Sequence, residues 1–137
     1  MLKKIVKEEG STDSERYLAK LASKSFFSLW SYPNLYRDEG ITKNGIGQET
    51  ADLMVVFGDT VIIFSDKKIG WTKHSDVMVN WGRWYRSSVI SSAKQLYGSE
   101  AFIRKHPERI FLDKYCKLPF PINLGLKDLK VHLVAVT

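Results

Sequence analysis

The chain has 137 residues, of which 44% are hydrophobic, and its formal net charge is +6. This length favours one domain, residues 1–137, large enough to bury a core. Cys116 is the one cysteine, so no internal disulfide can form, and no apolar run approaches the roughly 18–20 residues of a membrane span. The basic N-terminus is not followed by the apolar segment of a secretory signal. We therefore expect a cytoplasmic protein whose positive charge favours a polyanionic partner, first of all nucleic acid.

The first predicted element is an amphipathic helix from about Asp13 to Trp30, which ends before Pro33. Thr12 and Glu15 have the spacing of a capping box, which gives Glu15 an ordinary role at the start of the helix. Aromatic residues widen the apolar face near its end, at Phe26, Phe27 and Trp30. Residues 32–47 read as a loop with a short strand near Ile41 or Ile46.

Residues 49–68 predict a buried β-hairpin at the centre of the domain. Two apolar runs, Leu53 to Phe57 and Val61 to Phe64, flank the turn sequence Gly58-Asp59-Thr60. Acidic residues open the first strand and an acid-lysine-lysine triplet closes the second. Because the strands are antiparallel, these charges meet at one end of the hairpin, where a buried unpaired charge costs several kcal/mol.

The length of the turn decides which charges share a face. A two-residue loop, favoured by the turn chemistry, places Asp52 opposite Ser65 and on one face with Lys67. A three-residue loop places Asp52 opposite Asp66, so that both share a face with Lys68, as metal chemistry prefers. A β-bulge could reconcile the two registers.

After the hairpin, the pattern predicts a polar loop, a helix from Asn80 to Gly98 and a shorter helix from Ser99 to His106. Strands are expected at Glu108 to Asp113 and at Lys130 to Val136, the latter ending abruptly, as in a domain cut from a longer protein. Aromatic and basic residues interleave along the loop and first helix, which is typical of nucleic-acid contacts. We expect these contacts at Trp71, Lys73, Arg83 and Arg86, whereas helical spacing favours core positions for Trp81, Trp84, Tyr85 and Ser88.

The spacing of Asp52, thirteen further residues and then Asp66-Lys67-Lys68 resembles the signature of the PD-(D/E)XK nuclease superfamily. The resemblance implies an α/β, restriction-endonuclease-like αβββαβ core, in which a mixed sheet flanked by helices forms three layers. It also implies bound Mg²⁺ or Mn²⁺, because carboxylate oxygens suit these cations. The implied metal ligands are Asp52 and Asp66, with Glu15 as a further acid, and the implied catalytic lysine is Lys68. Alternates and secondary site residues are Glu49, Lys67 and Gln95.

These features favour a metal-dependent nuclease acting on the phosphodiester bonds of nucleic acid, with DNA favoured over RNA. A domain of the same fold that lost a metal ligand and only binds nucleic acid is the main alternative. A regulatory or assembly domain of a longer protein, contacting its other domains, is a third.

Overall fold

The structure is a computed structural model that describes residues 5–25, 30–71 and 73–137. The predicted positions Phe26 and Phe27 lie outside these residues. The elements in chain order are helix α1 (Asp13–Ser25), strand β1 (Ser31–Arg37), helix α3 (Ile41–Asn44), strands β2 (Gln48–Phe57) and β3 (Thr60–Asp66), helical segments α4 (Val77–Tyr85), η1 (Arg86–Ile90) and α5 (Ser91–Lys105), and strands β4 (Ile110–Phe111) and β5 (Lys130–Val136).

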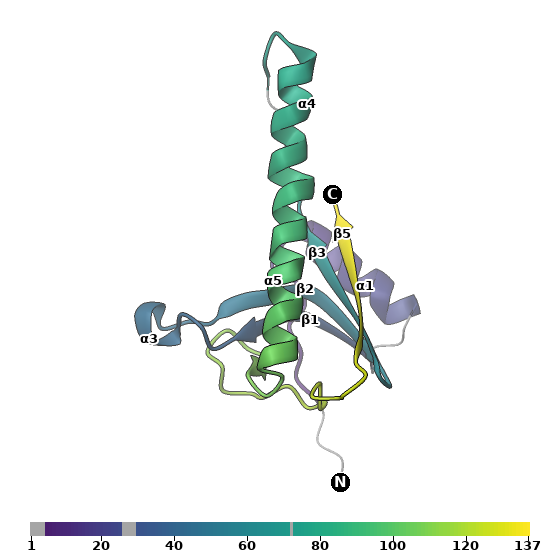
Figure 1. Ribbon diagram of the computed structural model, residues 1–137, viewed down its shortest axis with the longest axis vertical. Coiled ribbons are helices and arrows are strands. Elements are labelled where there is room, and N and C mark those ends of the chain that lie inside the picture. The colour runs from purple at the N-terminus through teal and green to yellow at the C-terminus, as the bar shows by residue number, and fades with distance from the viewer. Residues whose placement is uncertain (1–4, 26–29, 72) are drawn as a thin grey trace.

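In the described residues, five strands form one mixed sheet in the order β4-β1-β2-β3-β5. Strands β1, β2 and β3 form an antiparallel meander, and β5 returns parallel to β3 after the helical crossover. Helix α1 lies behind the sheet and α5 crosses its front (Figure 1). The expected α/β class with helices on both faces is confirmed. The main core packs α5 onto the sheet, through Met54, Val56, Val61, Ile63, Leu96 and Ile103.

The hairpin between β2 and β3 has the two-residue loop Gly58-Asp59. Phe57 pairs with Thr60 and Val56 with Val61, so the three-residue register that would set Asp52 opposite Asp66 is wrong. Gly58 has a φ of 58°, a conformation that glycine adopts without steric cost. A tight turn that begins with glycine also matches the twist of the two strands, which explains why turn chemistry decides the register.

One continuous helix runs from Val77 to Lys105, where the sequence predicted two. Its N-cap is Asp76, whose Oδ1 accepts a hydrogen bond from the Met78 amide, rather than Asn80. Gly98 does not end the helix, because its φ is not positive and the following Ser99 hydroxyl is held inside, 2.5 Å from the Thr50 carbonyl oxygen. Five residues in the middle, Arg86–Ile90, form a wider π-helical turn.

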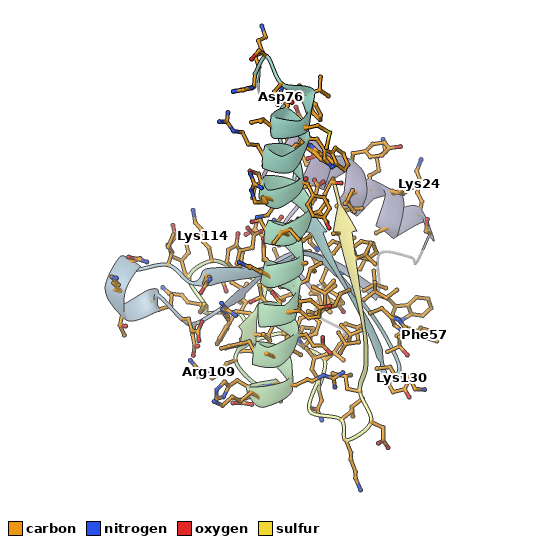
Figure 2. All side chains as sticks on the ribbon, turned by 45° about the horizontal axis from the view of Figure 1, so that its top comes forward. Lys24, Phe57, Asp76, Arg109, Lys114 and Lys130 are labelled. Atoms are coloured by element: carbon orange, nitrogen blue, oxygen red, sulfur yellow. The ribbon has the colours of Figure 1, made fainter. Side chains whose placement is uncertain are left out.

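The first third of this helix extends past the sheet. Figure 1 shows α4 rising beyond the ends of β3 and β5. Asp76 lies at its free end, far from Phe57 and Lys130 beside the hairpin turn (Figure 2). Among the described residues, no helix is both long enough and apolar enough to cross a membrane.

The stripe predicted to face the core does so only in part. Ser88 is fully buried and Trp84 is half-buried, whereas Arg83 and Arg86 are exposed, as predicted. The core positions predicted for Trp81 and Tyr85 are wrong, since 48% of Trp81 and 41% of Tyr85 are exposed. The reason is tertiary: the helix has the expected amphipathic spacing, but α4 reaches beyond the sheet that would cover this face.

The segment before the hairpin also differs from the prediction. Ser31–Arg37 forms strand β1 between β2 and β4, although it contains a proline, and Ile41 begins the short helix α3 instead of a strand. Ile46 lies outside any strand. Pairing on both edges overrides the weak local preference of this sequence for strand. Strand β4 is shorter than predicted, whereas β5 has the predicted bounds.

Candidate active site

Four carboxylates from three elements gather where β2 begins and β3 ends. Glu15 comes from α1, Glu49 and Asp52 from β2, and Asp66 from β3. The charges of Glu15, Glu49 and Asp66 each act to raise the pKa of Asp52, so the four groups form one electrostatic cluster. Burying like charges together is unfavourable unless protons, hydrogen-bond donors or cations offset the repulsion.

Asn34 of β1 supplies such donors. Its side-chain amide Nδ2 donates to Glu49 Oε1 at 2.7 Å and to Glu15 Oε2 at 3.2 Å, and the residue is 1% exposed. Its backbone has a φ of 48°, a left-handed conformation that asparagine tolerates better than most residues. Asn34 therefore bridges helix α1 and strand β2 across β1.

The strands are irregular at this point. Tyr32 and Leu35 both join the core cluster that includes α5, as do Ala51 and Met54. Residues three apart point to opposite faces of a regular strand, so the alternation breaks in both strands, at Asn34 and at Asp52. The break turns Asp52 toward α1 and reconciles the two-residue turn with a shared location for Asp52 and Asp66.

Asp52 is the most perturbed carboxyl of the cluster. It is 7% exposed, and its Oδ2 accepts a hydrogen bond of 2.5 Å from the backbone amide of Asp66. Burial raises the pKa of Asp52 to about 7, with smaller upward contributions from Glu49, Glu15 and Asp66, while the Asp66 amide acts in the opposite direction. Asp52 therefore keeps its proton to a higher pH than an ordinary aspartate, and an approaching cation would favour the loss of that proton.

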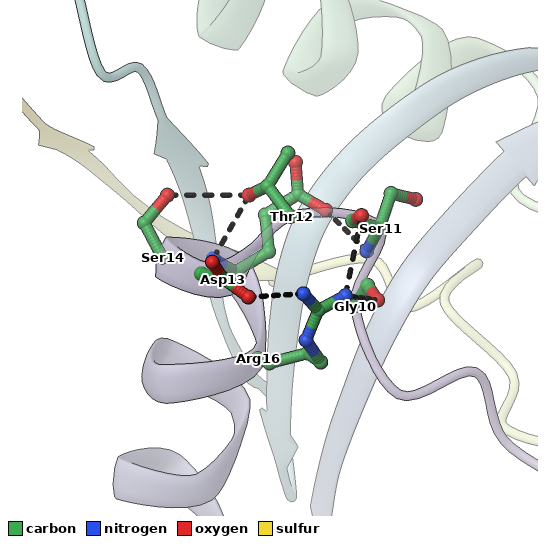
Figure 3. Close-up of polar contacts among 7 residues, drawn as sticks. Gly10, Ser11, Thr12, Asp13, Ser14 and Arg16 are labelled. Atoms are coloured by element: carbon green, nitrogen blue, oxygen red, sulfur yellow. Dashed lines mark hydrogen bonds and ion pairs between the residues drawn. The ribbon is translucent and has the colours of Figure 1, made fainter.

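Glu49 and Glu15 differ in their surroundings. Burial raises the pKa of Glu49, the hydrogen bond from Asn34 lowers it, and the charge of Glu15 raises it further. Glu15 has a capping role as well, since its Oε2 accepts from the Ser11 amide and its own amide donates to Thr12 Oγ1. Figure 3 shows these contacts around the first turn of α1, where Arg16 also pairs with Asp13. The capping role and the acid-cluster role of Glu15 thus coexist.

A surface depression of about 310 Å³ opens beside this cluster, lined by Thr12, Asp13, Ser14, Glu15, Asp66 and Lys68. Lys68 therefore lies with Asp66 and Glu15. Lys67 lies on the other side of the sheet, where its Nζ donates to Ser91 Oγ of α5 at 2.8 Å. The two consecutive lysines are thus separated by the sheet, with Lys68 on the side of the acids.

A hard divalent cation suits the donor set. Asp66 Oδ2 and Asn34 Oδ1 are buried and have no hydrogen-bond partner among the described residues. Mg²⁺ and Mn²⁺ take oxygen ligands of this kind. In the described part of the chain, however, no three His, Cys, Asp or Glu side chains converge closely enough to hold a metal ion. The residues that would hold a cation here are Asp52 and Asp66, with Glu15 nearby.

The other predicted site residues lie apart from the acids. Gln95 is half-buried on α5, one turn after Ser91, and thus on the Lys67 side of the sheet. The predicted nucleic-acid contacts are all exposed and lie on the loop before α4 or on the long helix, at Trp71, Lys73, Arg83 and Arg86. The structure therefore places the acids and Lys68 at the open end of the hairpin, and the exposed aromatic and basic residues on the projecting helix and the loop before it.

Sequence reasoning missed Asn34, the residue that holds two of the acids. The sequence signal for Asn34 is weak, because asparagine after proline is typical of a turn. Its place across from Asp52 follows only from the neighbouring pairs Pro33–Leu53 and Leu35–Ala51 of β1 and β2. Comparisons with family models, with curated proteins and with solved structures find no match for the chain. The resemblance to the PD-(D/E)XK nucleases thus depends on these residues and on their arrangement.

Proposed function

We propose that this protein is a metal-dependent nuclease of the PD-(D/E)XK type with a restriction-endonuclease-like fold. The observation that carries the proposal is that Asp66, Lys68 and Glu15 line one depression at the open end of the hairpin, with the buried Asp52 hydrogen-bonded to the Asp66 amide. The order of elements supports it too, since a helix, an antiparallel three-stranded meander and a helical crossover to a strand parallel to β3 follow the αβββαβ order.

The chemistry follows from the residue types. A divalent cation, when bound, neutralises charge on the scissile phosphate and activates water. Asp52 and Asp66 would provide the anionic oxygens that hold it, and Asn34 keeps Glu15 and Glu49 in place beside them. The ammonium group of Lys68 is suited to orient the attacking water or to stabilise the charge that develops on the phosphate. Lys67, which is hydrogen-bonded to Ser91 on the other side of the sheet, has no catalytic role in this proposal.

A binding-only domain of the same fold is the second candidate. One observation favours it: the acids of the described chain do not converge into a ready ligand set. Such a domain would keep the basic surface and bind nucleic acid without a requirement for Mg²⁺. The two candidates therefore differ in metal dependence and in the need for Lys68.

The test compares Lys68→Ala with Lys67→Ala, two neighbouring lysines on opposite sides of the sheet. Nicking and degradation of DNA and RNA, single-stranded and duplex, are measured with Mg²⁺ or Mn²⁺ and with a chelator control. We expect Lys68→Ala to lower cleavage by on the order of a hundredfold or more, as does Asp66→Asn, while Lys67→Ala stays within a few fold of the parent. Thermal unfolding of each variant confirms that it is folded.

Two results would contradict the nuclease. The first is the reverse order, in which Lys67→Ala loses activity and Lys68→Ala keeps it, which would move the site to the α5 side of the sheet. The second is no cleavage by the parent protein with any substrate or metal, together with no rise in melting temperature on addition of Mn²⁺. That second result favours the binding-only domain.

A further inference from the structure

Three aromatic rings form a row on the projecting helix α4. Trp81 stacks on Trp84 with ring centroids 5.3 Å apart and planes inclined by 29°, and on Tyr85 with centroids 6.0 Å apart and planes inclined by 30°. Trp81 and Tyr85 are 48% and 41% exposed. The three rings thus present a rigid aromatic surface to solvent, and two of them have open area for a further flat group.

This row continues the face of the helix that packs on the sheet. Ser88 is fully buried and Trp84, four residues earlier, is half-buried, so the row begins where the packed face of the helix ends. The helix continues into α4 past the ends of β3 and β5 (Figure 1). Val77 and Met78 add to the exposed apolar surface at 69% and 73%. An exposed apolar surface of this kind marks a contact site.

The charge around the row identifies the kind of partner. Residues 71–90, from the loop before α4 to the end of the π-helical turn, contain three basic residues, Lys73, Arg83 and Arg86, and one acidic residue, so this segment has a net charge of +2. That one acid, Asp76, is engaged as the N-cap of α4. A second copy of the chain would bring two such positive segments together, which is unfavourable, whereas a polyanion is attracted.

We propose that unpaired bases of a single-stranded nucleic acid stack on Trp81 and Tyr85, while Arg83 and Arg86 contact its phosphates. Base stacking on aromatic side chains requires open base faces, which a duplex does not offer. The guanidinium of Arg86 lies beside Gly82, where the lack of a side chain leaves room along the helix. The inference rests on the proposed function for its choice of nucleic acid, and it narrows the substrate class to strands with an unpaired segment.

Hydrogen bonds fix the loop that precedes the aromatic row. The side chain of Asn80 is buried and donates to the His74 carbonyl, which fixes the loop before α4 against the helix. The His74 ring in turn accepts from the Asp76 amide through Nδ1. A preformed surface of this kind loses little conformational entropy on binding.

The experiment measures binding of a fluorescent 20-nucleotide single strand, and of the same sequence as a duplex, by anisotropy in a chelator, so that no metal-dependent cleavage takes place. We expect the double variant Trp81→Ala, Tyr85→Ala to bind the single strand at least tenfold more weakly, with duplex binding changed less than about threefold. Tyr97→Ala, which removes a 67% exposed tyrosine from the same helix, is the matched control and should bind as the parent does. Trp81→Phe keeps a ring and should retain most of the affinity.

Salt separates stacking from charge. Raising the salt from about 50 to about 200 mM should weaken parent binding steeply, and Arg83→Gln with Arg86→Gln should make that dependence shallower. The aromatic double variant should keep the parent's salt dependence, because it removes no charge.

Three outcomes would overturn the inference: equal loss in Tyr97→Ala, preference of the parent for the duplex, or a dimer in sedimentation that the aromatic variant converts to monomer. Since binding is measured without metal, a protein that cleaves nothing but binds single strands through these rings contradicts the nuclease alone. A protein that cleaves but binds without these rings contradicts this inference alone.

Discussion

The end of the hairpin and the projecting helix are opposites in charge and in burial. At the hairpin end, four carboxylates lie close together, one of them 7% exposed, and a buried asparagine holds two of them. On α4, aromatic side chains lie in solvent among basic residues. The first arrangement lowers the stability of the fold at neutral pH and the second adds little to it, so neither is explained by stability alone. The contrast indicates that function shaped both regions.

Asp52→Asn should give the largest change in stability, and it should be a gain. In the folded protein Asp52 keeps its proton up to about pH 7, whereas in the unfolded chain it loses the proton near 3.8. Between these values the folded state binds more protons, so the free energy of unfolding falls as pH rises. Asparagine removes this loss and can still accept from the Asp66 amide.

We expect the free energy of unfolding of Asp52→Asn to exceed that of the parent by up to roughly 4 kcal/mol at pH 8, with the difference shrinking toward pH 4, as measured by denaturant unfolding without metal. Asp59→Asn is the control of opposite sign, because its hydrogen bond from Lys130 lowers the pKa of Asp59. Removing the Asp59 carboxylate should lower the free energy of unfolding slightly at neutral pH. An unchanged pH profile in Asp52→Asn would show that Asp52 is not the perturbed acid.

Asn34→Gly should have the next largest effect, a loss of about 1–3 kcal/mol at pH 7, because Glu15 and Glu49 lose a shared donor in a buried site. Glycine keeps the left-handed backbone conformation, so the change reports on the amide. Asn123→Gly is the matched control, since it also removes an asparagine side chain, but from an exposed loop. Equal losses in the two variants would contradict a special role for Asn34.

Trp81→Ala should have the smallest effect, less than about 1.5 kcal/mol in denaturant unfolding, because the two stacking contacts that it removes, with Trp84 and Tyr85, lie on a surface that the core does not cover. Leu96→Ala, on the buried part of the same helix, should cost about 2–5 kcal/mol. If the two variants lost similar stability, α4 would be an integral part of the core, and the contrast between the two regions would fail.

The parts of the fold that follow local rules could be predicted from sequence. The hairpin, the capped start of α1 and the bounds of β5 follow from turn residues, a capping box and an apolar run. Strand β1 could not be predicted, because Pro33 and Asn34 oppose a strand locally and only the pairing with β2 and β4 forms it. Asp76 and Asn80 are both good capping residues. In the structure Asp76 caps the helix, while the Asn80 side chain inside the first turns donates to the His74 carbonyl of the preceding loop.

The sequence predicted which acids belong to the candidate site, but it did not predict how the strands bring their side chains together. The spacing of Asp52 and Asp66 indicated that they meet, but a regular hairpin with a two-residue turn sets them on opposite faces. The irregularity at Asn34 and Asp52 that brings them together depends on two strands at once, and no single stretch of sequence reports it. The exposure of Trp81 and Tyr85 depends on where the sheet ends, which helical spacing cannot tell.

The π-helical turn at Arg86–Ile90 has a consequence for how the helix is aimed. Relative to an α-helix, such a turn accommodates one extra residue, and each residue of an α-helix turns the chain by about 100°. The extra residue is thus taken up within the turn, so α4 faces as it would in an uninterrupted α-helix that is one residue shorter. Removing one exposed residue there, Ser87, would let an ordinary α-helical turn join α4 to α5 with the stacked rings facing nearly the same way. We expect that deletion variant to bind a single strand about as the parent does, and a large loss of binding would show that the wider turn itself positions the rings.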